Sequence, residues 1–177
     1  DETFVRELCA RYEIPLHVAS GEIHPGKKGL EAAARDTRYA FLESLPGKIA
    51  TAHTADDNAE TILMHLVRGT GLKGLGGIAP QRGKLIRPML GITRREVEDF
   101  LAEWHLPHVE DSTNKTDAFL RNRLRHHVMP LLAAENPRIA ENLSQMALRL
   151  REDEACLSQL SSYETLPEVE TLRTLPS

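Results

Sequence analysis

The amino-acid sequence predicts an α/β fold with a parallel sheet, followed by the start of an α-helical domain. Segments with apolar residues at helical spacing alternate with short apolar segments over roughly the first half of the chain. This order is typical of parallel strands joined by crossover helices. The later part shows only helical patterns and an acidic tail, so we divide the chain into residues 1–134 and 135–177.

The first five elements follow from local sequence signals. Apolar residues at helical spacing predict three helices, and short apolar runs predict two strands between them. Phe4, Leu8 and Tyr12 carry the first helical pattern, and Pro46-Gly47 ends the second helix. The expected helices are residues 1–12, 30–45 and 55–68, and the expected strands are residues 14–19 and 48–53.

Three further helices are expected after residue 93. Thr93 is expected to cap the first of them, with Glu96 completing a capping box, and Asn136-Pro137 separates the other two. Five glycines between residues 69 and 77 exclude a regular helix in that segment. The expected helices are residues 94–104, 117–134 and 138–160, with a strand at residues 84–88 and a loop at residues 106–114.

The composition is typical of a folded soluble protein, with 41% hydrophobic and 27% charged residues. No apolar run approaches the ~20 residues that a membrane-spanning helix needs, so no membrane partner is expected. Cys9 and Cys156 lie far apart and outside any CxxC pair. This favours reduced, structural thiols in a cytoplasmic protein over a redox or metal role.

Basic residues are clustered, although the net charge is −4. The 28 residues from Arg68 to Arg95 contain seven basic side chains and no acidic one. Either a phosphate-contacting surface or an ordinary solvated face explains this stretch.

The segment HTADDNAET, residues 53–61, lies where an expected strand passes into a helix. Ligands of open α/β sheets bind at this end of the strands. The helix dipole offers a structural reason for one of the two adjacent acids, Asp56 and Asp57. Asp57 and Glu60 share one helix face, and with His53 they suit a cationic ligand or a metal-bound phosphate.

Two classes of enzyme fit these side chains. A metallohydrolase would use His53, Asp56 and Asp57 as metal ligands, but the other histidines show no tight ligand spacing such as HExxH. A nucleotide-dependent enzyme would use the acids to bind an amine and magnesium. The residues that follow favour the second class.

The run HTADDNAETILMHLVRGTGLKGLGGI, residues 53–78, resembles the second signature of tRNA(Ile)-lysidine synthetases, which are PP-loop ATP pyrophosphatases. Three more segments resemble the same family in the same order. They are residues 31–39, residues 86–90 with Arg94 and Glu96, and residues 110–114 with residues 121–125. The similarity covers roughly residues 1–140 and implies a Rossmann-like PP-loop ATPase domain, with a helical tRNA-binding domain after it.

The resemblance implies an ATP- and magnesium-dependent reaction on the wobble cytidine of tRNA(Ile) with the CAU anticodon. The cytidine is adenylated at its 2-position oxygen, and the side-chain amine of free lysine then displaces AMP to give lysidine. The implied partners are tRNA(Ile), ATP and free lysine, and a homodimer is left open. Asp57 and Glu60 would bind the lysine, and His53 or one of the acids would take a proton from its amine.

Cationic side chains receive the remaining roles. The resemblance assigns Arg35 or Arg38, together with Arg121, to the charge that develops on the phosphate. Asp56 is the candidate for magnesium bound with ATP. The basic stretches supply the expected tRNA contacts, which are Arg68, Lys73, Arg87, Arg123 and Arg125.

Structural alternatives stand beside these roles. Arg35 and Arg38 fit a surface helix face, and residues 121–125 fit an ordinary basic helix. Residues 72–78 fit either a flexible connector or a close approach of backbone to RNA. Asp111 and Asn114 fit a turn as well as a catalytic role.

PP-loop enzymes carry a Ser-Gly-Gly-x-Asp-Ser loop that holds pyrophosphate, and no segment of the chain matches it. We expect this loop and the first strands upstream of Asp1, and further tRNA-binding domains after Ser177. The chain alone is therefore expected to be inactive. A tRNA thiolation enzyme of the same superfamily, for which Cys9 and Cys156 supply no obvious chemistry, and a non-catalytic RNA-binding remnant are the alternatives.

Overall fold

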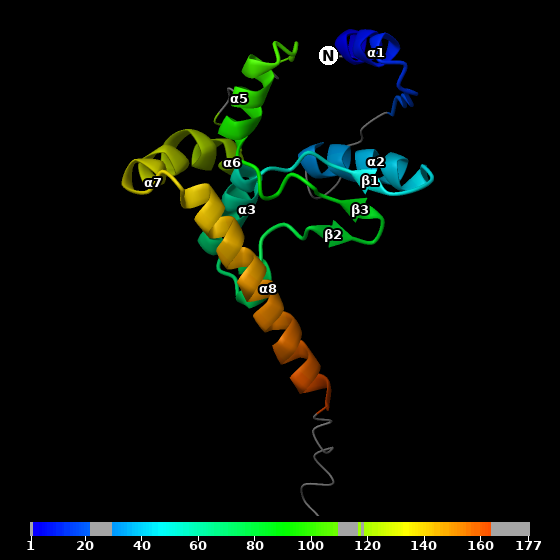
Figure 1. The fold of residues 1–177 in the computed structure, drawn as a ribbon. Helices are drawn as coiled ribbons and strands as arrows, with labels where there is room; N and C mark the ends of the chain where they lie inside the picture. Colours follow the sequence, from blue (N-terminus) through cyan, green and yellow to red (C-terminus); the bar gives the residue numbers. More distant parts are fainter. Residues whose placement is uncertain (1, 22–29, 110–116, 118, 164–177) are drawn as a thin grey trace, which may run out of the picture.

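The computed structural model describes residues 2–21, 30–109, 117 and 119–163. Most of the expected elements are present, and three strands and a series of helices follow one another along the chain (Figure 1). The strands are β1 (Ile49–Ala50), β2 (Gln81–Arg82) and β3 (Leu85–Ile86). The helices are α1 (Glu2–Arg11), α2 (Leu30–Ser44), α3 (Ala55–Val67), α4 (Leu72–Leu75), α5 (Arg94–Glu103), α6 (Leu120–Arg123), the π-helical segment η2 (Leu124–Val128), α7 (Met129–Glu135) and α8 (Ile139–Tyr163).

The sheet is small and mixed, with the strand order β1-β3-β2. Parallel pairing is present, but between β1 and β3, with Ile49 opposite Leu85, and not between the expected strands at residues 14–19 and 48–53. The strand β2 was not predicted and joins β3 as an antiparallel hairpin. Tyr39 and Leu42 of α2 pack against Ile49 and Leu85, so α2 covers the sheet and brings its arginines to the end of β1.

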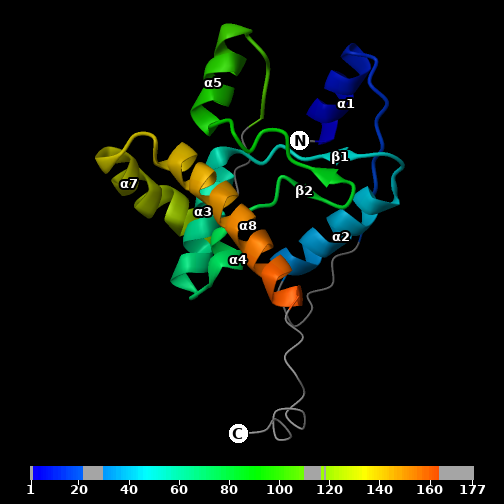
Figure 2. The ribbon, with the colours of Figure 1, turned by 60° about the horizontal axis from the view of Figure 1, so that its bottom comes forward.

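A second core joins α3 to the long C-terminal helix α8, which crosses α3 and continues beyond it (Figures 1 and 2). Ala55 and Ala59 of α3 are completely buried and meet Ala140 of α8, with Met129 and Leu143 around them. Small side chains allow the two helix backbones to approach closely. The helix that we assigned to the start of the second domain therefore packs directly on the helix that carries Asp57.

Local signals at α5 are confirmed in detail. Thr93 accepts a hydrogen bond from the Glu96 amide, and the Glu96 carboxylate accepts one from the Thr93 amide at 2.7 Å. This capping box satisfies backbone donors that the helix itself leaves without partners. None of the helices that the structure describes is long and apolar enough to cross a membrane.

Three expectations about secondary structure are wrong. Residues 14–19 form no strand, and Ile14 is 55% exposed. No described strand pairs with this segment, so its backbone makes no hydrogen bonds to a neighbouring strand. The glycine segment contains the short helix α4. The basic helix begins at Leu120 rather than at residue 117 and includes the π-helical turn η2.

The end of the glycine segment is fixed by contacts rather than being a free connector. Arg151 of α8 donates hydrogen bonds to the carbonyls of Gly76 and Gly77, each at 2.6 Å. His65 of α3 bonds the carbonyl of Gly74 at 2.7 Å. Gly77 has a φ of +60°, and a Cβ atom at this position would overlap the Asn58 side chain. Glycine, which has no Cβ, avoids both the backbone strain and the overlap.

Replacing Gly77 by Ala is therefore expected to lower the free energy of unfolding by about 2 kcal/mol, because positive φ and a steric clash act together. Gly69 also has a positive φ of +74° but has open space around it, so Gly69→Ala should cost only about 1 kcal/mol. Gly71→Ala meets neither problem and is the control. Urea denaturation followed by circular dichroism measures all three, and equal costs at Gly77 and Gly71 would contradict the expected packing.

Candidate active site

The residues after β1 and the first turn of α3 border a cavity of about 420 Å³. Its lining combines α2, the β1–α3 connection, α3 and α6, and it consists of Arg38, Tyr39, Leu42, Thr51, Ala52, His53, Asp57 and Arg121. Four residues that the resemblance assigns to catalysis thus meet at one place, at the carboxyl end of a parallel strand. They come from segments that are distant in the sequence.

Asp57 serves two partners at once. Its Oδ2 accepts a hydrogen bond from the Thr54 amide at 2.9 Å and lies 3.1 Å from the Thr54 hydroxyl, which completes the capping box of α3. Its Oδ1 accepts a hydrogen bond from Arg121 at 2.7 Å. Helix capping therefore accounts for the contacts of Oδ2. The other oxygen, Oδ1, faces the arginines that the fold brings to the site.

Glu60 lies behind Asp57 and is 2% exposed. One of its oxygens accepts hydrogen bonds from Arg121 Nε at 2.7 Å and Arg125 at 2.9 Å, and the other accepts one from Arg125 Nε at 2.6 Å. The hydrogen bond with Glu60 raises the pKa of Arg125. Arg125, expected to contact tRNA, is thus part of a buried ion-pair cluster, and Glu60 is enclosed by guanidinium groups.

His53 lies two residues before the start of α3, and its Nδ1 is 2.9 Å from the Thr51 hydroxyl. Burial lowers the pKa of His53, nearby Asp57 offsets part of that effect, and the positive charges of Arg87, Arg121 and Arg35 lower the pKa further. The imidazole is therefore largely neutral at neutral pH. A neutral imidazole beside a carboxylate can accept a proton from a bound amine.

Three positively charged side chains surround Tyr39, which lines the cavity. The guanidinium carbons of Arg35, Arg38 and Arg82 lie 5.4, 5.6 and 5.8 Å from the centroid of the Tyr39 ring. The ring thus holds three cations in one small region, where they suit a phosphate group. Tyr39 lies in the segment 31–39 and Arg82 in the basic stretch 68–95, but the sequence alone gave neither residue a role at the site.

Asp56 does not face the cavity residues. Its Oδ2 accepts a hydrogen bond from the Arg94 backbone amide at 2.6 Å and so ties α3 to the start of α5. Within the residues that the structure describes, no group of three or more His, Cys, Asp or Glu could hold a metal ion. The described side chains therefore do not form a magnesium site by themselves.

The residues expected to contact tRNA differ in accessibility. Arg68, Lys73 and Arg123 are exposed, and Arg123 donates to the Asp117 carbonyl at 3.0 Å. Arg87 is 7% exposed, and its guanidinium donates a hydrogen bond to the Ala79 carbonyl at 2.6 Å. This side chain therefore stabilises the fold and is not available at the surface for tRNA. Asp111 and Asn114, along with most of the loop that contains them, lie outside the described residues.

A model of the PP-loop domain matches residues 1–132. The match covers well over half of the chain and agrees with the parallel β1–β3 pair and the site at the end of β1. The chain belongs to the PP-loop domain family.

Within that family, curated relatives that the chain matches include tRNA(Ile)-lysidine synthases. The relative from Bacillus cereus is 38% identical, with 98% of this chain and 39% of the relative covered. The relative from Geobacter sulfurreducens is 41% identical, with 90% of this chain and 36% of the relative covered. The chain thus spans about two fifths of the length of these relatives.

Among solved structures, the U34-tRNA thiolase NcsA from Methanococcus maripaludis with its 4Fe-4S cluster has a similar fold. The TM-score is 0.61 at 17% identity, and the similarity covers 84% of this chain and 55% of that chain. At this identity the likeness concerns the fold alone. Cys9 and Cys156 are not among the residues that line the cavity.

Proposed function

We propose that this chain forms part of an enzyme that uses ATP to join lysine to the wobble cytidine of tRNA(Ile) with the CAU anticodon. The observation that carries the proposal is the cavity at the end of β1, where His53, Asp57, Arg38 and Arg121 meet. A carboxylate, a neutral base and phosphate-binding cations are the groups that amine transfer to an adenylated base requires. The lysidine synthase relatives support the same assignment.

In the first step, the 2-position oxygen of cytidine attacks the α-phosphate of ATP. A bond forms between this oxygen and phosphorus, and the bond from phosphorus to the departing pyrophosphate breaks. Negative charge develops on the phosphate oxygens. Arg38 and Arg121, which line the cavity, and Arg35 beside Tyr39 stabilise that charge.

In the second step, the side-chain amine of lysine attacks carbon 2 of the adenylated cytidine, and AMP leaves with the oxygen. The amine must first lose a proton, which His53 accepts in its neutral form. Asp57 Oδ1 holds the lysine ammonium at the position that Arg121 occupies in the free protein. Glu60 anchors Arg121 and Arg125, and it reaches the lysine only when Arg121 swings away.

The test uses the full-length protein with ATP, lysine and a tRNA(Ile) transcript that carries the CAU anticodon. AMP release should require all three, and the modified tRNA should gain the mass of lysine less water. A transcript with guanosine at the wobble position is the control and should not react. AMP release that is independent of lysine, or a product that contains sulfur, would exclude the proposal.

The lysine step should lose rate as the pH falls, because protonated His53 cannot accept a proton from the amine. Since the pKa of His53 is lowered, the midpoint of this loss should lie below 6.5, the ordinary value for histidine. The measurement is single-turnover lysine transfer to pre-formed adenylated tRNA between pH 5 and 8. In the His53→Gln variant, the loss of rate at low pH should disappear, and the rate of lysine transfer should fall by about 100-fold. An unchanged pH profile in the variant would exclude His53 as the base.

A further inference from the structure

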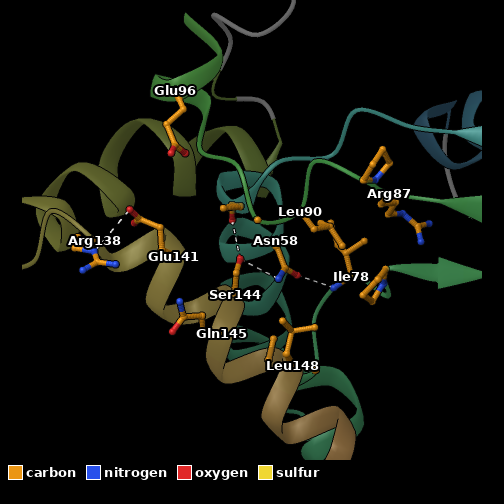
Figure 3. A pocket seen from close by; sticks show the side chains of 16 residues that line it. Asn58, Ile78, Arg87, Leu90, Glu96, Arg138, Glu141, Ser144, Gln145 and Leu148 are labelled. Atoms are coloured by element: carbon orange, nitrogen blue, oxygen red, sulfur yellow. Dashed lines mark hydrogen bonds and ion pairs between the residues drawn. The ribbon is translucent and has the colours of Figure 1, made fainter. Parts of the chain in front are cut away.

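Two buried polar side chains connect α3 to α8 on the side away from the arginine cluster. Asn58 and Ser144 are 3% and 6% exposed. The Asn58 amide donates to the Ser144 hydroxyl at 3.1 Å, and its carbonyl oxygen accepts from the Ile78 amide at 2.7 Å. The Ser144 hydroxyl in turn lies 3.4 Å from the Ala55 carbonyl (Figure 3).

These hydrogen bonds all engage the first turns of α3. Ala55 begins the helix, and Asn58 follows Asp57 directly. Ile78 comes directly after the glycine segment, whose last two carbonyls Arg151 of α8 also holds. One side of α3 is thereby fixed to α8 and the glycine segment. The other side presents Asp57 and Glu60 to Arg121 and Arg125.

The proposed binding of the lysine ammonium by Asp57 depends on the position of the first turn of α3. A shift of 1 Å in a reacting or binding group costs on the order of 100-fold in rate. Loss of the Ser144 hydroxyl would leave the buried Asn58 amide without its partner, and such a group moves toward a new one. The turn that carries Asp57 would move with it.

We infer that Ser144 and Asn58 are positioning residues for the lysine site, through which α8 sets the place of the Asp57 carboxylate. The inference rests on the proposed function, because it names the contacts that align its amine-binding carboxylate. Neither residue lines the cavity that contains His53 and Asp57. Their effect on lysine must therefore act through the position of α3.

A matched pair of variants isolates the hydroxyl. Ser144→Val and Ser144→Thr have the same shape, and only threonine keeps the oxygen that meets Asn58. Ser144 lines a separate cavity of about 430 Å³ between α8 and the residues that follow α4, so the added methyl groups have room (Figure 3). Gln145→Ala, which changes an exposed neighbour on the same helix, is the control.

In the full-length protein, Ser144→Val should raise the lysine KM by about tenfold, while adenylated tRNA forms without lysine within about threefold of the normal rate. Ser144→Thr and Gln145→Ala should keep the normal lysine KM. Amide hydrogen exchange at residues 55–60 should accelerate in the valine variant and not in the threonine variant. Equal lysine KM values for valine and threonine, or equal losses in both chemical steps, would overturn the inference.

The exchange measurement also separates this inference from the proposed function. If the unaltered protein makes no lysidine, the proposed function fails, and the kinetic part of the inference fails with it. If lysidine is made but exchange at residues 55–60 is the same in both variants, only the inference is overturned.

Discussion

Replacing Asp57 by Asn in the full-length protein is expected to lower lysine-dependent AMP release by about 100-fold or more, since truncating one partner of a desolvated charge pair costs 2–5 kcal/mol. Asn keeps the shape of the side chain, and its side-chain oxygen can still accept the hydrogen bond from the Thr54 amide. It cannot attract an ammonium group as a carboxylate does. The loss should therefore appear mainly as a raised lysine KM. The tRNA affinity should change by less than about twofold, because the arginines that pair with Asp57, Arg121 and Arg125, are also held by Glu60 in the ion-pair cluster.

Asp56→Asn is the matched control, because Asp56 is the adjacent acid and accepts a hydrogen bond from the Arg94 amide instead of facing the cavity. Its lysine KM should stay within about twofold of the normal value. The comparison is made by steady-state kinetics at several lysine concentrations, with tRNA binding measured by filter retention. If Asp56→Asn raised the lysine KM as much as Asp57→Asn, the assignment of the ammonium to Asp57 would be wrong.

Replacing Glu60 by Ala is expected to lower the free energy of unfolding by about 3 kcal/mol, because removing one member of a buried ion-pair cluster leaves the opposite charges without compensation. Glu60 is almost inaccessible, and its two oxygens accept three hydrogen bonds from Arg121 and Arg125. The value is at the lower end of the usual range because the side chains of Arg121 and Arg125 remain 31% and 19% exposed. Water can solvate part of their charge.

Glu135→Ala, at the exposed end of α7, is the control and should change stability by less than about 0.5 kcal/mol. Chemical denaturation followed by tryptophan fluorescence and circular dichroism measures both variants. A double variant, Glu60→Met with Arg125→Met, should recover part of the lost stability, since it removes charges of both signs from the buried cluster. A cost at Glu60 as small as that at Glu135 would mean that the ion pairs contribute nothing to folding.

Much of the local structure was predictable because its signals lie within a few residues of each other. The helices α1, α2, α3, α5 and α8 occur where apolar periodicity predicted them, within a few residues at their ends. The Thr93–Glu96 capping box requires only the right residue types at the right spacing, and it is present. Strands were less predictable, since residues 14–19 resemble a strand but have no described strand to pair with.

The sequence by itself determined the family, the helices and the placing of Asp57 and Glu60 on one face of α3, because a spacing of three residues is a property of the helix alone. Only the tertiary structure decided which cations meet those acids. Arg121 lies 61 residues beyond Glu60 and Arg125 lies 65 residues beyond it. Their pairing depends on how the helices after residue 119 pack on α3. The same holds for Asn58 and Ser144, 86 residues apart, whose hydrogen bond exists only because small alanines let α8 approach α3. Long-range contacts of this kind leave no periodic signal in a sequence, since they depend on the sum of many packing interactions and not on local spacing.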